Sequence, residues 1–224
     1  MGNTLSVTKE KEHLVAMRVL VACEESQAVT KAFRANGHEA YSADIQDCSG
    51  GHPEWHIKGD VLRVLNDGWD LMIAHPPCTY LANSGVQHLH KNPGRWDKLK
   101  EGVAFFKAFL DAPIKKICVE NPIPHKYAIG YNLTLFGESD GLEGQRPSQI
   151  IQPYMFGHRE QKATCLWLKG LPKLTPTSDL KSETMALPNK ERQRLHWASP
   201  GPMRAKLRSK TFRGIAEAMA CQWQ

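Results

Sequence analysis

Short runs of hydrophobic residues alternate along the chain with segments in which hydrophobic residues recur at helical spacing. The clearest runs cover residues 18–23, 69–74 and 115–120, and they resemble strands that are buried on both faces. Strands of this kind, separated by helices, pair as a parallel sheet with helices packed on its faces. The pattern therefore predicts an α/β fold that begins near Met17.

Helical segments lie between these runs and at the end of the chain. Residues 27–36 fit a helix that begins after Ser26, a good N-cap residue, and ends at Asn36-Gly37. The spacing of hydrophobic residues also predicts helices over residues 95–110 and 211–223. These helices supply the crossovers that a parallel sheet requires.

The remaining segments differ from one another in character. Residues 38–44 and 161–168 read as further strands. Residues 131–148 are rich in glycine and acidic residues, which indicates a long surface loop. Residues 169–208 hold five prolines and many basic residues with little apolar periodicity, which predicts an irregular basic segment.

The length of 224 residues, with 41% hydrophobic side chains, fits one compact domain or at most two small ones. We expect a disordered leader, an α/β core, a small basic segment and a closing helix that packs on the core. The predicted bounds are residues 1–16, 17–168, 169–208 and 209–224, in that order.

The chain carries 29 basic and 23 acidic residues, a net charge of +6. This balance fits a polyanionic partner such as DNA, although it also occurs in proteins that bind no nucleic acid. Basic residues are densest between Lys190 and Arg213. We expect this run to contact phosphates, and the alternative is an ordinary solvated face.

The sequence also bears on location and on metals. It has no stretch of the roughly 20 apolar residues that a membrane helix needs, and its N-terminus lacks the apolar core of a secretory signal. The six cysteines form no CxxC pair, which indicates free thiols in a reducing compartment. We therefore expect a cytoplasmic protein with no metal site and no obligate protein partner.

Two polar elements follow neighbouring predicted strands. Cys78 comes after His75-Pro76-Pro77, and prolines cannot continue a central strand, so this thiol is expected on a loop at the strand's carboxyl end. Glu120-Asn121-Pro122 follows the next strand. Open α/β sheets hold their ligands at this edge, so the two elements together predict a catalytic site.

These two elements resemble the Pro-Cys and Glu-Asn motifs of DNA (cytosine-5) methyltransferases, through Pro77-Cys78 and Glu120-Asn121. The segments HPPCTYLANSG, VENP and KATCLWLKGLP are similar to the corresponding segments of compact phage and prophage members of that family. The resemblance implies a Rossmann-like, doubly wound, mostly parallel sheet. It also implies a bacterial or phage-infected host, with evasion of restriction as the setting.

The implied chemistry suits these side chains. A thiolate at Cys78 would add to carbon 6 of cytosine, which activates carbon 5 toward an electrophilic methyl donor. We expect Glu120 to be held partly protonated beside ring nitrogen 3, and Asn121 to orient the loop or the carboxyl group. Further contacts to the substrate are expected from Pro77, Thr79, Asn83 and Lys162.

The donor implied by the resemblance is S-adenosylmethionine. Asp44 lies 21 residues after Cys23, the end of the first predicted strand, which suits an acceptor for ribose hydroxyl groups. The resemblance makes Asp60 an acceptor for the adenine amino group. The other residues expected to bind the donor are Cys23, Ser26 and His75.

Two departures from the family leave alternatives open. Residues 23–27 read CEESQ, where the family has a glycine-rich turn, so methylene-tetrahydrofolate and hydroxymethylation are an alternative donor and reaction. The segment 169–208 is too short for a full recognition domain, which predicts loose sequence specificity or a free cytosine nucleotide as substrate.

Two alternatives lie outside this reaction. A non-catalytic nucleic-acid-binding or anti-restriction protein could keep the same fold, although Cys78 and Glu120 are both retained. Amino-methyltransferases carry an aromatic residue after Pro-Pro, where this chain has Cys78, and we disfavour that class.

Overall fold

The apolar runs of the sequence pair side by side in a single sheet. The structure is a computed structural model that describes residues 15–128 and 146–224. The strands are β1 (Arg18–Ala22), β2 (Glu39–Asp44), β3 (His56–Lys58), β4 (Leu71–Ala74), β5 (Lys116–Pro122), β6 (Gln149–Ile151) and β7 (Thr164–Lys169).

The strand order in the sheet is β3-β2-β1-β4-β5-β7-β6. Strands β1 to β5 pair in parallel, while β7 runs antiparallel to both of its neighbours, β5 and β6. The chain reverses its direction of winding between β1 and β4, which is the switch point where open α/β sheets hold ligands. The predicted Rossmann-like, doubly wound, mostly parallel fold is confirmed.

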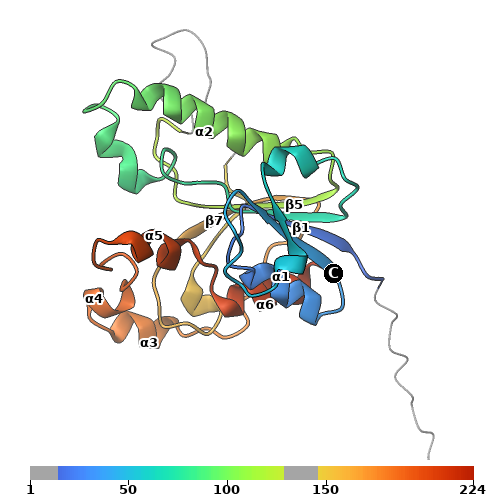
Figure 1. Ribbon diagram of the computed structural model, residues 1–224. Helices are drawn as coiled ribbons and strands as arrows, with labels where there is room; N and C mark the ends of the chain where they lie inside the picture. The colour runs from blue at the N-terminus through green and yellow to red at the C-terminus, as the bar shows by residue number, and fades with distance from the viewer. Residues whose placement is uncertain (1–14, 129–145) are drawn as a thin grey trace, which may run out of the picture.

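Helices cover both faces of this sheet (Figure 1). On one face, α2 (Arg95–Leu110) buries Leu99, Val103 and Phe106 against the sheet. On the other face, α1 (Ala28–Ala35) and α6 (Arg213–Gln222) pack together. Alternate residues of β1 and β4 enter the two cores, so both strands are buried on both sides, as their continuous apolar runs predicted.

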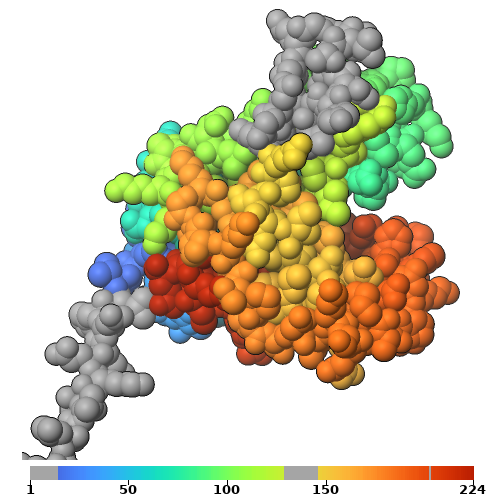
Figure 2. All heavy atoms as spheres, turned by 180° about the vertical axis from the view of Figure 1, so that it is seen from behind, coloured from blue at the N-terminus to red at the C-terminus, as the bar shows by residue number. Residues whose placement is uncertain are grey.

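The segment after β7 contains short helices rather than irregular chain throughout. They are α3 (Lys181–Ala186), α4 (Asn189–Arg192) and α5 (Pro202–Ser209). Pro188 precedes the first residue of α4, and Pro202 is the first residue of α5. Proline is well tolerated at a helix start, so these prolines begin helices instead of preventing them. Seen from behind, the orange atoms of this segment form a lobe beside the yellow atoms around β6 and β7 (Figure 2).

One predicted strand boundary also changes. Strand β5 continues through Pro122 because Glu120, Asn121 and Pro122 stay paired with β7, so these residues end the strand rather than follow it. The short strand β6 had no counterpart among the predicted elements.

Parts of the predicted leader and of the predicted loop at residues 131–148 lie outside the described residues. Among the helices that are described, none combines the length and hydrophobicity needed to cross a bilayer.

Candidate active site

Cys78 lies on the loop that leaves β4 at the carboxyl edge of the sheet. His75 continues the pairing with β1 through its amide, which donates to the Ala22 carbonyl at 2.9 Å, before Pro76 and Pro77 end the strand. The amides of Leu81 and Ala82 then both donate to the Cys78 carbonyl. The thiol is therefore carried by a tight turn at the predicted place.

Asn121 ties this loop to the neighbouring strand. Its buried Nδ2 donates to the Pro76 carbonyl at 2.8 Å, two residues before Cys78. A buried side-chain bond to a loop carbonyl limits the positions that the loop can take. Asn121 thus fixes Cys78 relative to Glu120, its own neighbour on β5.

Glu120 and His75 form a buried pair at this edge. His75 Nδ1 lies 2.9 Å from Glu120 Oε2, and the two side chains are 9% and 16% exposed. Burial raises the pKa of Glu120, but the hydrogen bond and charge of His75, with Lys162, outweigh it and hold the pKa below its usual value. Burial lowers the pKa of His75, but Glu120 outweighs this and raises it.

These opposite shifts favour transfer of a proton from the carboxyl group to the imidazole. The sequence predicted a partly protonated carboxyl group at Glu120, whereas the structure favours a Glu120 carboxylate beside an imidazolium. The reason is the His75 contact, which stabilises the charged form of the carboxyl group. His75, predicted to bind the methyl donor, therefore lies against the Glu120 carboxyl group instead.

The surroundings of Cys78 favour its neutral thiol. Partial burial and the negative charge of Glu120 raise the pKa of Cys78, while Lys162 and Arg208 act in the opposite direction. A thiolate is the nucleophilic form, so a bound substrate or donor has to favour deprotonation.

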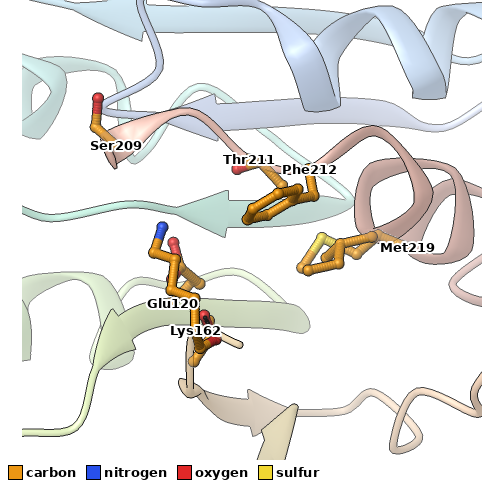
Figure 3. A pocket seen from close by; sticks show the side chains of 8 residues that line it. Glu120, Lys162, Ser209, Thr211, Phe212 and Met219 are labelled. Atoms are coloured by element: carbon orange, nitrogen blue, oxygen red, sulfur yellow. Dashed lines mark hydrogen bonds between the residues drawn. The ribbon is translucent and has the colours of Figure 1, made fainter. Parts of the chain in front are cut away.

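Lys162 joins the same site from the far side of β5. Strand β7 is antiparallel, so the residues just before it, Lys162 among them, lie beside the carboxyl end of β5. Lys162 Nζ donates to the Arg208 carbonyl at 2.7 Å, which brings α5 to this edge. Lys162 and Glu120 face Ser209, Thr211, Phe212 and Met219 across a narrow pocket (Figure 3). Its accessible volume of about 10 Å³ holds one water molecule at most.

The turn between β1 and α1 takes glycine-like conformations without glycine. Cys23 and Gln27 have φ angles of 57° and 55°, in the left-handed region. Such angles cost an L-residue roughly 1–2 kcal/mol each. The buried Gln27 side chain also bonds the backbone of His52 through both of its polar atoms, at 2.7 and 3.1 Å. The turn expected from the family is therefore made by strained residues that the rest of the fold holds in place.

Glu24, rather than Ser26, caps helix α1. Its buried carboxylate accepts from the amides of Val29 and Thr30 at 2.7 and 3.2 Å and from the Thr30 hydroxyl at 2.7 Å. Ser26 Oγ has one long contact, 3.4 Å, from the Ala28 amide. Ser26 precedes the left-handed Gln27, and its side chain reaches no further than the first helical residue.

Asp44 and Asp60 lie close to Cys23 at the end of β1. Burial, together with the charges of these two carboxylates, raises the pKa of Cys23 to about 12. Asp44 and Asp60 each use Oδ1 to accept from a nearby amide, that of Gln46 and Leu62. The structure thus brings together three residues that the sequence assigned to the donor.

The remaining predicted substrate residues lie on the open side of the Cys78 loop. Pro77, Thr79 and Asn83 are all exposed. The Thr79 carbonyl accepts from Arg95 at 3.3 Å. A side chain at Gly85 would approach this carbonyl within 2.9 Å, so the close packing there requires glycine.

Sequence reasoning missed several residues that shape this edge. Glu24 caps α1, and Glu25 lies 3.6 Å from Lys206 of α5, which links the β1–α1 turn to the basic segment. Arg95 lies over the Tyr80 ring and supports the Cys78 loop from α2. Two adjacent glutamates, Glu24 and Glu25, directly after an apolar strand could have indicated a role at this edge. Their partners, however, depend on the fold.

No protein-family model and no curated protein matches the chain. Among solved structures, it is similar to a protein described as a DNA modification methyltransferase encoded within an E. coli prophage, at 13% identity and a TM-score of 0.45. It is also similar to the Entamoeba histolytica methyltransferase EhMeth, at 14% identity and a TM-score of 0.47. These matches cover 78% and 74% of this chain, which spans 56% and 58% of those two proteins.

The fold and the site together define a class. The chain is a Rossmann-like α/β protein with a thiol, a buried carboxylate–imidazole pair and a lysine at the carboxyl edge of its sheet.

Proposed function

We propose that the protein methylates carbon 5 of cytosine in DNA, with Cys78 as nucleophile. The observation that carries this proposal is the hydrogen bond between Asn121 and the Pro76 carbonyl, because it fixes the loop of Cys78 beside the strand of Glu120. A nucleophile and a proton-bearing group held on adjacent strands can act on two atoms of one planar ring.

Each residue has a separate task. Cys78 adds to carbon 6, and Glu120, once it has received a proton, donates a hydrogen bond to ring nitrogen 3 and so draws electrons from the ring during the addition. Lys162 balances the charge of Glu120 and faces the same pocket. A cytosine within duplex DNA has to leave the helix to reach these groups.

The residues expected to bind the adenosine part of S-adenosylmethionine fit that group, whereas the site expected for its carboxylate does not. Among the described residues, Oδ2 of Asp44 and of Asp60 makes no hydrogen bond, so each can accept from a ribose hydroxyl or an adenine amino group. Glu24 occupies the start of α1, so the donor's own carboxylate is not held there. When bound, this donor supplies an electrophilic methyl group on a sulfonium.

The charge of this region separates the two candidate donors. Asp44, at the end of β2, and Asp60, after β3, bring negative charge close to Cys23 at the end of β1, which attracts a sulfonium and repels the anionic tail of a folate. This charge distribution favours methyl transfer from S-adenosylmethionine over hydroxymethylation with methylene-tetrahydrofolate.

The basic run favours DNA over a free nucleotide. Lys190 and Lys210 are exposed on the segment that carries α5, and α5 reaches the catalytic edge through the Lys162 contact. Phosphates on either side of a flipped base can bind such lysines, whereas a free nucleotide offers them one phosphate group. A recognition segment this small predicts loose sequence preference.

Labelled methyl transfer to unmodified DNA tests the proposal. Purified protein with labelled S-adenosylmethionine should yield 5-methylcytosine, identified by mass spectrometry of the nucleosides. Cys78→Ser should abolish transfer, while Cys221→Ser, at an exposed thiol on α6, should retain it. An active Cys78→Ser protein, or transfer from methylene-tetrahydrofolate alone, would contradict the proposal.

A second readout separates the enzyme from a silent binding protein. DNA that contains 5-fluorocytosine traps the nucleophile, because the fluorine cannot be removed as a proton is. The wild-type protein should form a denaturation-resistant adduct that maps to Cys78. DNA binding without any adduct would favour the non-catalytic, anti-restriction alternative.

A further inference from the structure

The side chain of His75 is almost fully buried, although His75 begins a loop. Its side chain is 9% exposed and its Nδ1 contacts Glu120, while Nε2 is buried without a partner among the described residues. A buried polar atom without a partner costs roughly 1–3 kcal/mol. The fold therefore retains this imidazole although its second nitrogen is unsatisfied.

Charged groups from three elements face this imidazole. Glu120 comes from β5, Glu24 from the β1–α1 turn, and Lys162 from the segment before β7. The two carboxylates favour the imidazolium and Lys162 opposes it. On balance they raise the pKa of His75, which faces Glu24 on the predicted donor side and Glu120 on the predicted base side of the site.

We propose that His75 is a positioning residue that stores the proton which Glu120 delivers to ring nitrogen 3 of cytosine. This inference rests on the proposed function. It assigns the proton to the imidazole that precedes Pro76, so that the nucleophile and its proton source lie on the same loop, three residues apart.

The proton transfer balances within the site. As the Cys78 thiolate forms its bond to carbon 6, the C5=C6 electron pair shifts toward carbon 4 and the C4=N3 pair moves to nitrogen 3. Nδ1 of His75 passes its proton to the Glu120 carboxylate, which delivers that proton to nitrogen 3, so Glu120 ends as a carboxylate again and the imidazole is left neutral. After methylation, carbon 5 loses its hydrogen to water, the C6–S bond breaks, and nitrogen 3 returns its proton to the pair.

The pH profile of adduct formation tests this role. We would measure the single-turnover rate of Cys78 adduct formation on 5-fluorocytosine DNA, with saturating S-adenosylmethionine, between pH 5.5 and 9. In His75→Gln, Glu120 must hold the proton alone, and a carboxyl group releases it at lower pH than an imidazolium does. The decline at high pH should therefore begin at lower pH, with a loss of roughly 10²-fold at pH 8.

A matched control keeps structural effects apart. His38 is a buried histidine that accepts from the Met17 amide on the opposite edge of the sheet, and His38→Gln should leave the profile unchanged. An equal loss at every pH in His75→Gln, or no loss, would overturn the inference. An absence of adduct in the wild-type protein would instead contradict the proposed function.

A direct titration does not depend on any variant. The imidazole resonance of His75, assigned by its disappearance in His75→Gln, should titrate above the ordinary histidine value of about 6.5 in the wild-type protein. Glu120→Gln should move that midpoint downward. A wild-type midpoint at or below the ordinary value would also overturn the inference.

Discussion

At the scale of single residues, burial and the charge of Glu120 both lower the reactivity of Cys78. Burial and this charge raise the pKa of Cys78, so less thiolate exists at a given pH than in an ordinary thiol. Iodoacetamide should therefore alkylate Cys78 slowly at pH 8, with a rate that keeps rising at higher pH. Glu120→Gln removes the charge, lowers this pKa and should speed alkylation about tenfold, which is one pKa unit.

Peptide mass spectrometry can follow Cys78 and Cys221 in the same reaction. Cys221 is exposed, so its alkylation rate should be the same in both proteins. If Cys78 reacts no faster in Glu120→Gln while Cys221 is unchanged, the charge of Glu120 does not control the thiol.

The donor site gives a second prediction at this scale. Asp60→Asn keeps Oδ1, which caps the turn at Leu62, but removes the charge near Cys23. It should weaken S-adenosylmethionine binding by roughly tenfold in calorimetry, the loss of one charged hydrogen bond. Asp47→Asn is the control, because the exposed Asp47 pairs with Lys58 instead. Equal affinities of the Asp60→Asn and wild-type proteins would remove Asp60 from the donor site.

The sequence predicted the positions of the single candidate residues better than their pairing. Cys78 and Glu120 follow from prolines and strand ends, which are local features. The bond between His75 and Glu120 joins residues 45 positions apart, and the register of two strands determines it. No local pattern shows which buried nitrogen meets which carboxylate, so the His75 contact that lowers the pKa of Glu120 could not be predicted.

At the scale of elements, the start of α1 depends on Glu24. Its carboxylate accepts three hydrogen bonds from Val29 and Thr30. Glu24→Gln keeps the shape but turns an amide NH₂ toward these donors, and should lower the free energy of unfolding by about 1–3 kcal/mol. Urea denaturation measures this, and the exposed Glu39→Gln should change it by less than about 0.5 kcal/mol. Equal stabilities would show that Glu24 is not the cap.

Elements with strong apolar periodicity were predicted well. The bounds of α2 agree with the prediction at both ends, because four buried residues repeat at helical spacing. The short helices α3 to α5 have few buried side chains, and the prolines that begin α4 and α5 made the segment look irregular. Weakly buried elements leave little trace in the hydrophobic pattern.

At the scale of the whole molecule, the chain places the candidate site at the carboxyl edge of the sheet beside a small basic lobe. Glu25 meets Lys206, and Lys162 meets the Arg208 carbonyl, so α5 contacts the site from two sides. Several basic side chains of the lobe already have protein partners, such as Arg194 with the buried Glu160. The net charge of +6 therefore overstates the number of cations free to contact phosphates.

The salt dependence of DNA binding counts those free cations. Removing one lysine that binds a phosphate should reduce the slope of log K against log salt by about one. Lys190→Ala and Lys210→Ala, both exposed in the lobe, should each lower the slope by about one and weaken binding to all DNA sequences alike. Lys98→Ala on α2, which removes a pair with Glu101, should leave the slope unchanged. A slope that falls equally in all three variants would mean that DNA is held by the overall charge, and the lobe would then not be its binding surface.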